Sequence, residues 1–153
     1  MSMEPILISA CLLGAGCRYD GGGNPVLSVE ALMGQYQLIP VCPEQLGGLP
    51  TPRAPAERQG AQVVTASGCD VTASFLRGAA QALYLARLFG CKKAVLKERS
   101  PSCGAGSIYD GTFSGTLTPG DGVTAELLKA NGIAVYGESE IEALLDDAPG
   151  SLF

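Results

Sequence analysis

The sequence predicts a single-domain α/β protein, a three-layer sandwich with a mainly parallel, Rossmann-like sheet of four or five strands. Two observations predict it. Short apolar runs lack polar alternation, as is typical of strands covered on both faces, and helical patterns lie between these runs. At 153 residues the chain is long enough to bury a core of its own. We expect one domain over 1–153, with its core at about 5–145 and a C-terminal tail at 146–153.

The alternation of strand and helix indicates right-handed crossovers within one sheet. The expected strands are "PILISA" at 5–10, "QLIPV" at 37–41, "KKAVL" at 92–96 and "IAVYG" at 133–137.

The clearest helix covers 70–89 and has Gly90 as its stop signal. Asp70 or Thr72 can cap its start. Apolar residues recur near helical spacing along this segment, which predicts that they form its buried face. These residues are Phe75, Leu76, Ala79, Ala80, Leu83 and Leu88.

A second helix is predicted to open at "TPGDG" and to end at the Asn-Gly pair 131–132. Thr118 and Asp121 have the spacing of a capping box, with an acid in place of Glu, and Pro119 suits the first helical position. These signals place the helix start at the threonine.

Two shorter helices and one long loop complete the expected elements. Ser28 starts the segment "SVEALMGQ", and Ser139 with Glu142 repeats the capping signal before "IEALL". The proline-rich stretch 47–60 is too long for a simple connection, so we expect a lid or a binding loop there.

Charge and composition exclude several classes of protein. The chain has 15 acidic and 10 basic residues, a net charge of −5, which argues against a general binder of nucleic acid or of anionic membranes. The start "MSMEPILISACLL" has no basic region or cleavage pattern of a signal peptide, and no apolar run reaches the roughly 18 residues needed to cross a bilayer. We expect a cytoplasmic location, where thiols stay reduced.

Three of the six cysteines come after predicted strands. Cys11 follows the first strand, Cys42 follows the second, and Cys103 lies in the loop after the third. Ligands of open parallel sheets bind beyond the carboxyl ends of the strands. We therefore expect these three thiols to gather at one edge of the sheet.

The other cysteines have weaker claims to a site. Cys17 lies six residues after Cys11 and is the nearest rival as a ligand. Cys91 precedes its strand, so it belongs at the opposite edge or in the core, and Cys69 stands alone before a helix start. A single reduced cysteine is more often buried filler than a ligand, but three at successive strand ends favour a site.

The type of ligand points to an iron–sulfur cluster. A structural zinc site needs four ligands, usually from close pairs, whereas this chain has no C-x-x-C pair and no histidine. The missing pair also argues against a thiol redox enzyme. A [4Fe–4S] cluster prefers thiolates and normally takes four, so three would leave one iron open to a substrate atom, sulfur especially.

Several polar residues share the predicted edge. Glu44, two residues after Cys42, could shuttle a proton or activate water, although an exposed loop acid is the alternative. Ser100 and Ser102 could orient a ligand or merely cap turns. Arg53 could reach a polar ligand or form a surface salt bridge.

Three blocks of the sequence carry a resemblance to a known family. They are "ISACLLGAGCRYDGGGN", "CPEQLGGLPTPRAPAE" and "LKERSPSCG". Together they resemble the signature blocks of the thiouracil desulfidase family, formerly catalogued as domain of unknown function 523, over about residues 5–145. The resemblance implies a [4Fe–4S] cluster held by three cysteines that match Cys11, Cys42 and Cys103, with a fourth iron that binds the sulfur of the substrate.

The resemblance also implies roles for polar residues and a reaction. Glu44 matches the acid that transfers a proton, and Ser100 matches the serine that assists at the ring, with Ser102 too close in sequence to separate from it. The implied reaction converts thiouracil (4-thiouracil, 2-thiouracil or a nucleoside) and water to uracil and sulfide without net electron transfer. Larger relatives with an extra domain act on thiolated RNA, so a single acidic domain favours the free base or nucleoside.

One alternative function stays open at this point. A non-catalytic iron–sulfur or metal-binding carrier or sensor would use the same three cysteine ligands. Such a protein would not depend on Glu44, which separates the two hypotheses.

Overall fold

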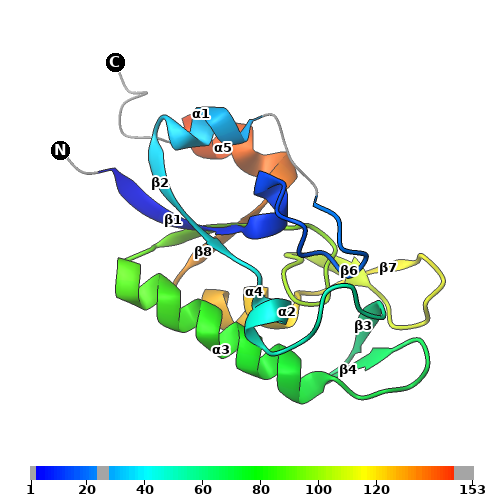
Figure 1. Ribbon diagram of the computed structural model, residues 1–153. Coiled ribbons are helices and arrows are strands. Elements are labelled where there is room, and N and C mark those ends of the chain that lie inside the picture. The colour runs from blue at the N-terminus through cyan, green and yellow to red at the C-terminus, as the bar shows by residue number, and fades with distance from the viewer. Residues whose placement is uncertain (1–2, 24–27, 147–153) are drawn as a thin grey trace.

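The computed structural model describes residues 3–23 and 28–146 (Figure 1). Its centre is a four-stranded parallel sheet, which confirms the predicted α/β class. The predicted tail falls almost entirely outside the described residues. In spatial order, the strands are β2 (Tyr36–Val41), β1 (Glu4–Ser9), β5 (Lys93–Leu96) and β8 (Ala134–Gly137).

Helices cover both faces of this sheet, which gives the three predicted layers (Figure 1). One face carries α1 (Val29–Met33) and α5 (Ile141–Asp146), and the other carries α3 (Thr72–Phe89) and α4 (Val123–Ala130). None of the described helices is long and apolar enough to cross a membrane.

Strand β1 lies between β2 and β5, and its side chains enter both layers of the core. Ile6 and Ile8 pack in the cluster with α1 and α5, whereas Leu7 packs with α3 and α4. All three side chains are fully buried. Successive residues of a strand point to opposite faces, so an unbroken apolar run is what a doubly covered strand requires.

Helix α3 begins at Thr72, whose N–H donates to the carboxylate of Asp70, and ends at Gly90 in the left-handed conformation. Its buried face is narrower than predicted, because Leu76, Ala80 and Leu88 are exposed. These three lie outside the arc of about 100° that a surface helix turns toward its core. The residues within that arc are Phe75, Gly78, Ala79, Ala82, Leu83 and Ala86.

The predicted start of the helix at "TPGDG" is wrong, although its end at Asn131 and Gly132 is close to the observed end. Thr118 and Pro119 belong to β7 (Leu117–Pro119), which pairs antiparallel with β6 (Ser107–Tyr109). The Asp121 carboxylate accepts the N–H of Gly106 at 2.8 Å instead of capping a helix. Helix α4 therefore begins only at Val123, because pairing with a distant segment overrides the local capping signal.

The capping prediction at Ser139 is also wrong. Its N–H donates to the carboxylate of Glu98 at 2.9 Å, and Glu140 accepts the N–H of Gly137 at the start of the preceding 3-10 turn η2 (Glu138–Glu140). Ser28 does stand at the N-cap of α1, but its side chain makes no capping bond.

The proline-rich stretch is only partly a loop. Its last residues form β3 (Ala56–Gln59), which pairs antiparallel with β4 (Gln62–Thr65). Neither this hairpin nor the β6–β7 pair was predicted from the sequence. The strand "AERQ" is short and polar, so it lacks the apolar signal of a core strand.

Two glycines let the short helix α2 (Pro43–Leu46) lie directly against α3. A Cβ atom on Gly78 would stand 1.8 Å from the carbonyl oxygen of Pro43, and one on Gly47 would stand 2.0 Å from that of Ser74. Any side chain at these positions must push the helices apart. The close contact therefore fixes where α2 and its Glu44 lie.

We expect Gly78→Ala to lower the free energy of unfolding by about 1–3 kcal/mol, as over-packing does, although alanine is the better helix former. Urea denaturation of both proteins measures this difference. Gly34→Ala is the matched control, since its Cβ atom would come no closer than 3.4 Å to any neighbour. A Gly78→Ala variant as stable as the wild type would contradict the close approach of α2 and α3.

Candidate active site

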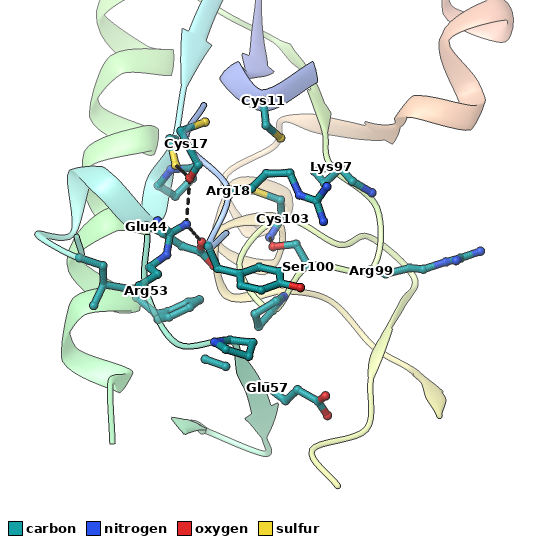
Figure 2. A pocket seen from close by; sticks show the side chains of 18 of the residues that line it. Cys11, Cys17, Arg18, Glu44, Arg53, Glu57, Lys97, Arg99, Ser100 and Cys103 are labelled. Atoms are coloured by element: carbon teal, nitrogen blue, oxygen red, sulfur yellow. Dashed lines mark hydrogen bonds and ion pairs between the residues drawn. The ribbon is translucent and has the colours of Figure 1, made fainter. Parts of the chain in front are cut away.

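Three cysteines from different connections line one cavity of about 580 Å³ (Figure 2). Cys11 lies in the 3-10 turn η1 (Ala10–Leu13) that follows β1, and Cys42 joins β2 to α2. Cys103 lies in the loop after β5. The fold thus brings the three predicted residues together where the parallel strands end.

Burial makes the thiols of Cys11 and Cys103 poor acids. It raises the pKa of Cys11 to about 11, with a further contribution from the neighbouring Cys42, while Lys97 and Arg18 partly offset the rise. Burial likewise raises the pKa of Cys103 to about 12, although a hydrogen bond with Ser9 favours its thiolate. A metal centre that binds these sulfurs must therefore displace their protons.

The rival cysteine, Cys17, lines the same cavity and is 5% exposed. Burial and the nearby Cys42 and Cys11 raise its pKa to about 12. The thiol of Cys42 donates to the carbonyl oxygen of Cys17 at 3.7 Å. Cys91, by contrast, packs in the core beneath α3 and α4, and Cys69 is exposed away from the cavity.

Three cysteine sulfurs around one cavity fit an iron–sulfur cluster, which prefers thiolate ligands. Among the described residues, no three His, Cys, Asp or Glu side chains are placed to share one metal ion. One zinc ion draws its sulfur ligands to about 4 Å from each other, because each Zn–S bond is about 2.3 Å long. A cubane binds each cysteine through a different iron, so its ligands stand farther apart around a shared cavity.

Glu44 is held by a buried arginine. It follows Pro43 in the first turn of α2, and its side chain is 18% exposed. The guanidinium of Arg53, only 7% exposed, pairs with the carboxylate of Glu44 and also donates to the carbonyl oxygen of Cys17 at 3.0 Å (Figure 2). Glu44 is therefore not a free loop acid, and its pair with Arg53 is not a surface salt bridge.

The structure separates the two serines that the sequence leaves equivalent. Ser100 lines the cavity, and its hydroxyl oxygen accepts the N–H groups of Ser102 and Cys103, each at 3.1 Å. Ser102 is fully buried, and its hydroxyl bonds with that of Thr124 at 2.8 Å. Ser102 is thus placed to support the loop and not to touch a ligand in the cavity.

Several polar residues of the cavity were not predicted from the sequence, among them Ser9, Arg18 and Lys97. Ser9 ends β1 and accepts the N–H of Lys97 at 2.9 Å, while the ammonium of Lys97 pairs with Glu138 at 2.9 Å. Both lie at carboxyl ends of strands, so the rule that found the cysteines applies to them as well. Arg18 carries no comparable signal beyond its place next to Cys17.

The parallel sheet with thiols at the carboxyl ends of its strands makes this an α/β protein with a cysteine-lined site. Comparison with known proteins identifies the family. The family model described as 2-thiouracil desulfurase matches residues 6–140. The chain therefore belongs to that family, which confirms the resemblance of the three sequence blocks.

Two similar proteins cover nearly the whole chain. The "Uncharacterized protein YbbK" of Bacillus subtilis (strain 168) is 45% identical over 150 residues, which cover 92% of this chain and 99% of that protein. A solved structure described as the [4Fe-4S]-dependent thiouracil desulfidase TudS (DUF523Vcz) is similar with 51% identity and a TM-score of 0.89. That match covers 92% of this chain and 95% of the other.

Proposed function

We propose that this protein is a [4Fe–4S]-dependent desulfidase that converts a thiolated pyrimidine and water into the pyrimidine and sulfide. The observation that carries this proposal is the cavity into which three cysteines from separate connections, two of them buried, converge beside Glu44. Membership of the 2-thiouracil desulfurase family supports it, as does the similarity to a structure described as a [4Fe-4S]-dependent thiouracil desulfidase.

Cys11, Cys42 and Cys103 would hold the cluster. When bound, it supplies a Lewis-acid iron without a protein ligand, at which the substrate's sulfur can bind. The soft thiolate ligands suit iron, and so does the soft sulfur of a thiocarbonyl substrate. Because the pKa values of Cys11 and Cys103 lie at about 11 and 12, loading the site must release protons.

Glu44 would move the proton. In the proposed reaction, water attacks the ring carbon that carries sulfur, and the carboxylate takes a proton from this water. The C–S bond then breaks as the added hydroxyl becomes the ring carbonyl. The carboxylic acid of Glu44 passes its proton to the departing sulfur, and the hydroxyl proton is released to solvent, so the products are the pyrimidine and hydrosulfide. The reaction is a hydrolysis with no change in oxidation state, so it consumes no reductant.

Ser100 would orient the pyrimidine ring. Its oxygen already accepts two backbone N–H groups, which leaves its own O–H to donate into the cavity. An acceptor atom of the ring, such as a carbonyl oxygen, fits this donor.

The proposed substrates are 4-thiouracil, 2-thiouracil or a nucleoside of either, in preference to RNA. The cavity volume of about 580 Å³ lies in the range typical of small-molecule sites, and a net charge of −5 disfavours a long polyanion. All six cysteines are free thiols in the structure, which is consistent with the cytoplasm as the proposed location.

The direct test is anaerobic reconstitution with iron and sulfide, followed by addition of 4-thiouracil, 2-thiouracil or 4-thiouridine. We expect loss of the thiocarbonyl's near-ultraviolet absorbance and stoichiometric release of sulfide. Cluster-free protein is the control and should be inert. An intact cluster with no turnover of any of these compounds would overturn the enzymatic proposal and favour a carrier or sensor.

Ser100→Ala and Ser102→Ala are expected to differ in their effect on turnover. Loss of the Ser100 hydroxyl should lower kcat/KM about 10-fold, which is the effect of one hydrogen bond to substrate, and it also leaves the N–H groups of Ser102 and Cys103 without their acceptor. Loss of the buried Ser102 hydroxyl leaves Thr124 without its partner, so it should cost about 1–3 kcal/mol of stability with little effect on turnover by folded protein. Kinetics and urea denaturation of both variants measure the difference; an inactive but fully stable Ser102→Ala variant would reverse the assignment.

A further inference from the structure

Arg53 is a buried cation whose hydrogen-bond donors are almost all used by the protein. An arginine side chain has five N–H donors. In Arg53, Nη1 donates to the carbonyl oxygen of Pro50 at 3.1 Å and to the hydroxyl of Thr51 at 3.0 Å, while Nη2 donates to Glu44 and to the carbonyl oxygen of Cys17. Only the Nε–H has no recorded acceptor among the described residues. Little donor capacity is left for a substrate.

The same residue connects three separate segments of the chain. Its backbone N–H donates to the carbonyl oxygen of Tyr19 at 2.6 Å, and its guanidinium contacts both α2 and the carbonyl of Cys17. The thiol of Cys42 reaches that same carbonyl. Arg53 thus ties the carboxylate of Glu44 to the cysteine-bearing part of the cavity wall.

We propose that Arg53 is a positioning residue for the desulfidase reaction, which holds the Glu44 carboxylate in place and does not bind the substrate. This inference rests on the proposed function, because it gives Arg53 a role only through Glu44. Arg53 occupies Oε2 of Glu44, and no hydrogen bond to Oε1 occurs among the described residues. Oε1 is therefore the oxygen available for the proton of the attacking water.

The chemistry of the pair explains why arginine suits this position. The planar guanidinium places its five N–H groups in fixed directions, so one side chain can orient a carboxylate and a carbonyl at once. Lysine has the charge but not this fixed geometry. A neutral residue would leave the half-buried carboxylate of Glu44 without its partner.

A double-mutant cycle with Glu44→Gln and Arg53→Met tests the inference in reconstituted enzyme of measured iron content. We expect Arg53→Met to lower kcat by about 10- to 100-fold, the usual effect of losing a group that orients an active-site residue, and to change KM less than about threefold. In the Glu44→Gln background, Arg53→Met should have almost no further effect on kcat, since both changes remove one function. Arg53→Lys should fall between wild type and Arg53→Met.

Three outcomes would overturn the inference. A higher KM with an unchanged kcat for Arg53→Met would make Arg53 a substrate-binding residue. Additive losses in the cycle would show that Arg53 does not act through Glu44. A fully active Glu44→Gln would exclude both the proton-transfer role of Glu44 and the positioning role of Arg53. Additive losses, by contrast, would exclude only the positioning role of Arg53, because Glu44→Gln would still lower kcat.

A measurement without the cluster guards against a folding defect. In isotope-labelled, cluster-free protein, we expect separate, slowly exchanging Nη signals for Arg53. The Nη2 signals should shift in Glu44→Gln, because a neutral amide replaces the carboxylate that they contact. Freely rotating Nη groups in the wild type would contradict the clamp. Arg87→Met is the matched control, because Arg87 lies on α3 away from the cavity and pairs with Asn131. It should leave kcat and the Arg53 signals unchanged.

Discussion

Cys103→Ser is expected to abolish both cluster binding and thiouracil turnover. With three proposed cysteine ligands, none can be spared, and a serine hydroxyl is a far weaker ligand for iron than a thiolate. Cys103 is also buried, so no external thiol can easily take its place. Iron and sulfide content per chain, the visible absorbance of the reconstituted protein and sulfide release together measure the effect. Activity should fall to the level of cluster-free protein.

The other cysteines provide matched controls for this prediction. Cys11→Ser and Cys42→Ser should behave like Cys103→Ser, whereas Cys69→Ser should bind a full cluster, because Cys69 is exposed outside the cavity. Cys17→Ser is the informative comparison, since its thiol lines the same cavity. If Cys17→Ser lost the cluster while Cys42→Ser kept it, the proposed ligand set would be wrong.

Glu44→Gln is expected to lower kcat by about 10²–10⁴, the usual contribution of a general acid or base. The amide can still accept a hydrogen bond from Arg53, but it cannot take a proton from water. Iron content should stay at the wild-type level, because Glu44 is not one of the proposed ligands. Single-turnover loss of 4-thiouracil absorbance measures the chemical step separately from product release.

Glu30→Gln is the control for this change, because Glu30 is an exposed residue of α1 outside the cavity. It should have wild-type kinetics. A Glu44→Gln enzyme with wild-type kcat and a full cluster would exclude proton transfer by Glu44 and would leave the cavity's other polar groups to be tested.

Much of the fold was predictable because the parallel strands have a strong local signal. The four strands of the parallel sheet lie within a residue of the runs that were predicted, since each is mostly apolar and lacks polar alternation. The prediction failed where pairing between distant segments decided the outcome. Thr118 and Pro119 resemble a helix start but pair with β6, and the polar strand β3 has no apolar run to reveal it.

The width of the buried face of α3 was wrongly predicted for a different reason. Apolar residues such as Leu76 and Leu88 continue around the helix, but only one arc of it is buried. Most residues of that arc are small, and Gly78 lies against α2. The sequence pattern shows that a helix is amphipathic, yet it cannot show how closely a neighbour approaches.

That Cys11, Cys42 and Cys103 gather in one place could be predicted from the sequence, because they follow successive strands and parallel strands end at one edge of the sheet. That Ser100 faces the cavity while Ser102 is buried against Thr124, and that Glu44 is paired with Arg53, is seen only in the three-dimensional structure. The reason is physical. The positions of the strands and their parallel direction follow from patterns that are local in the chain, whereas side-chain partners and burial depend on segments that are distant in sequence.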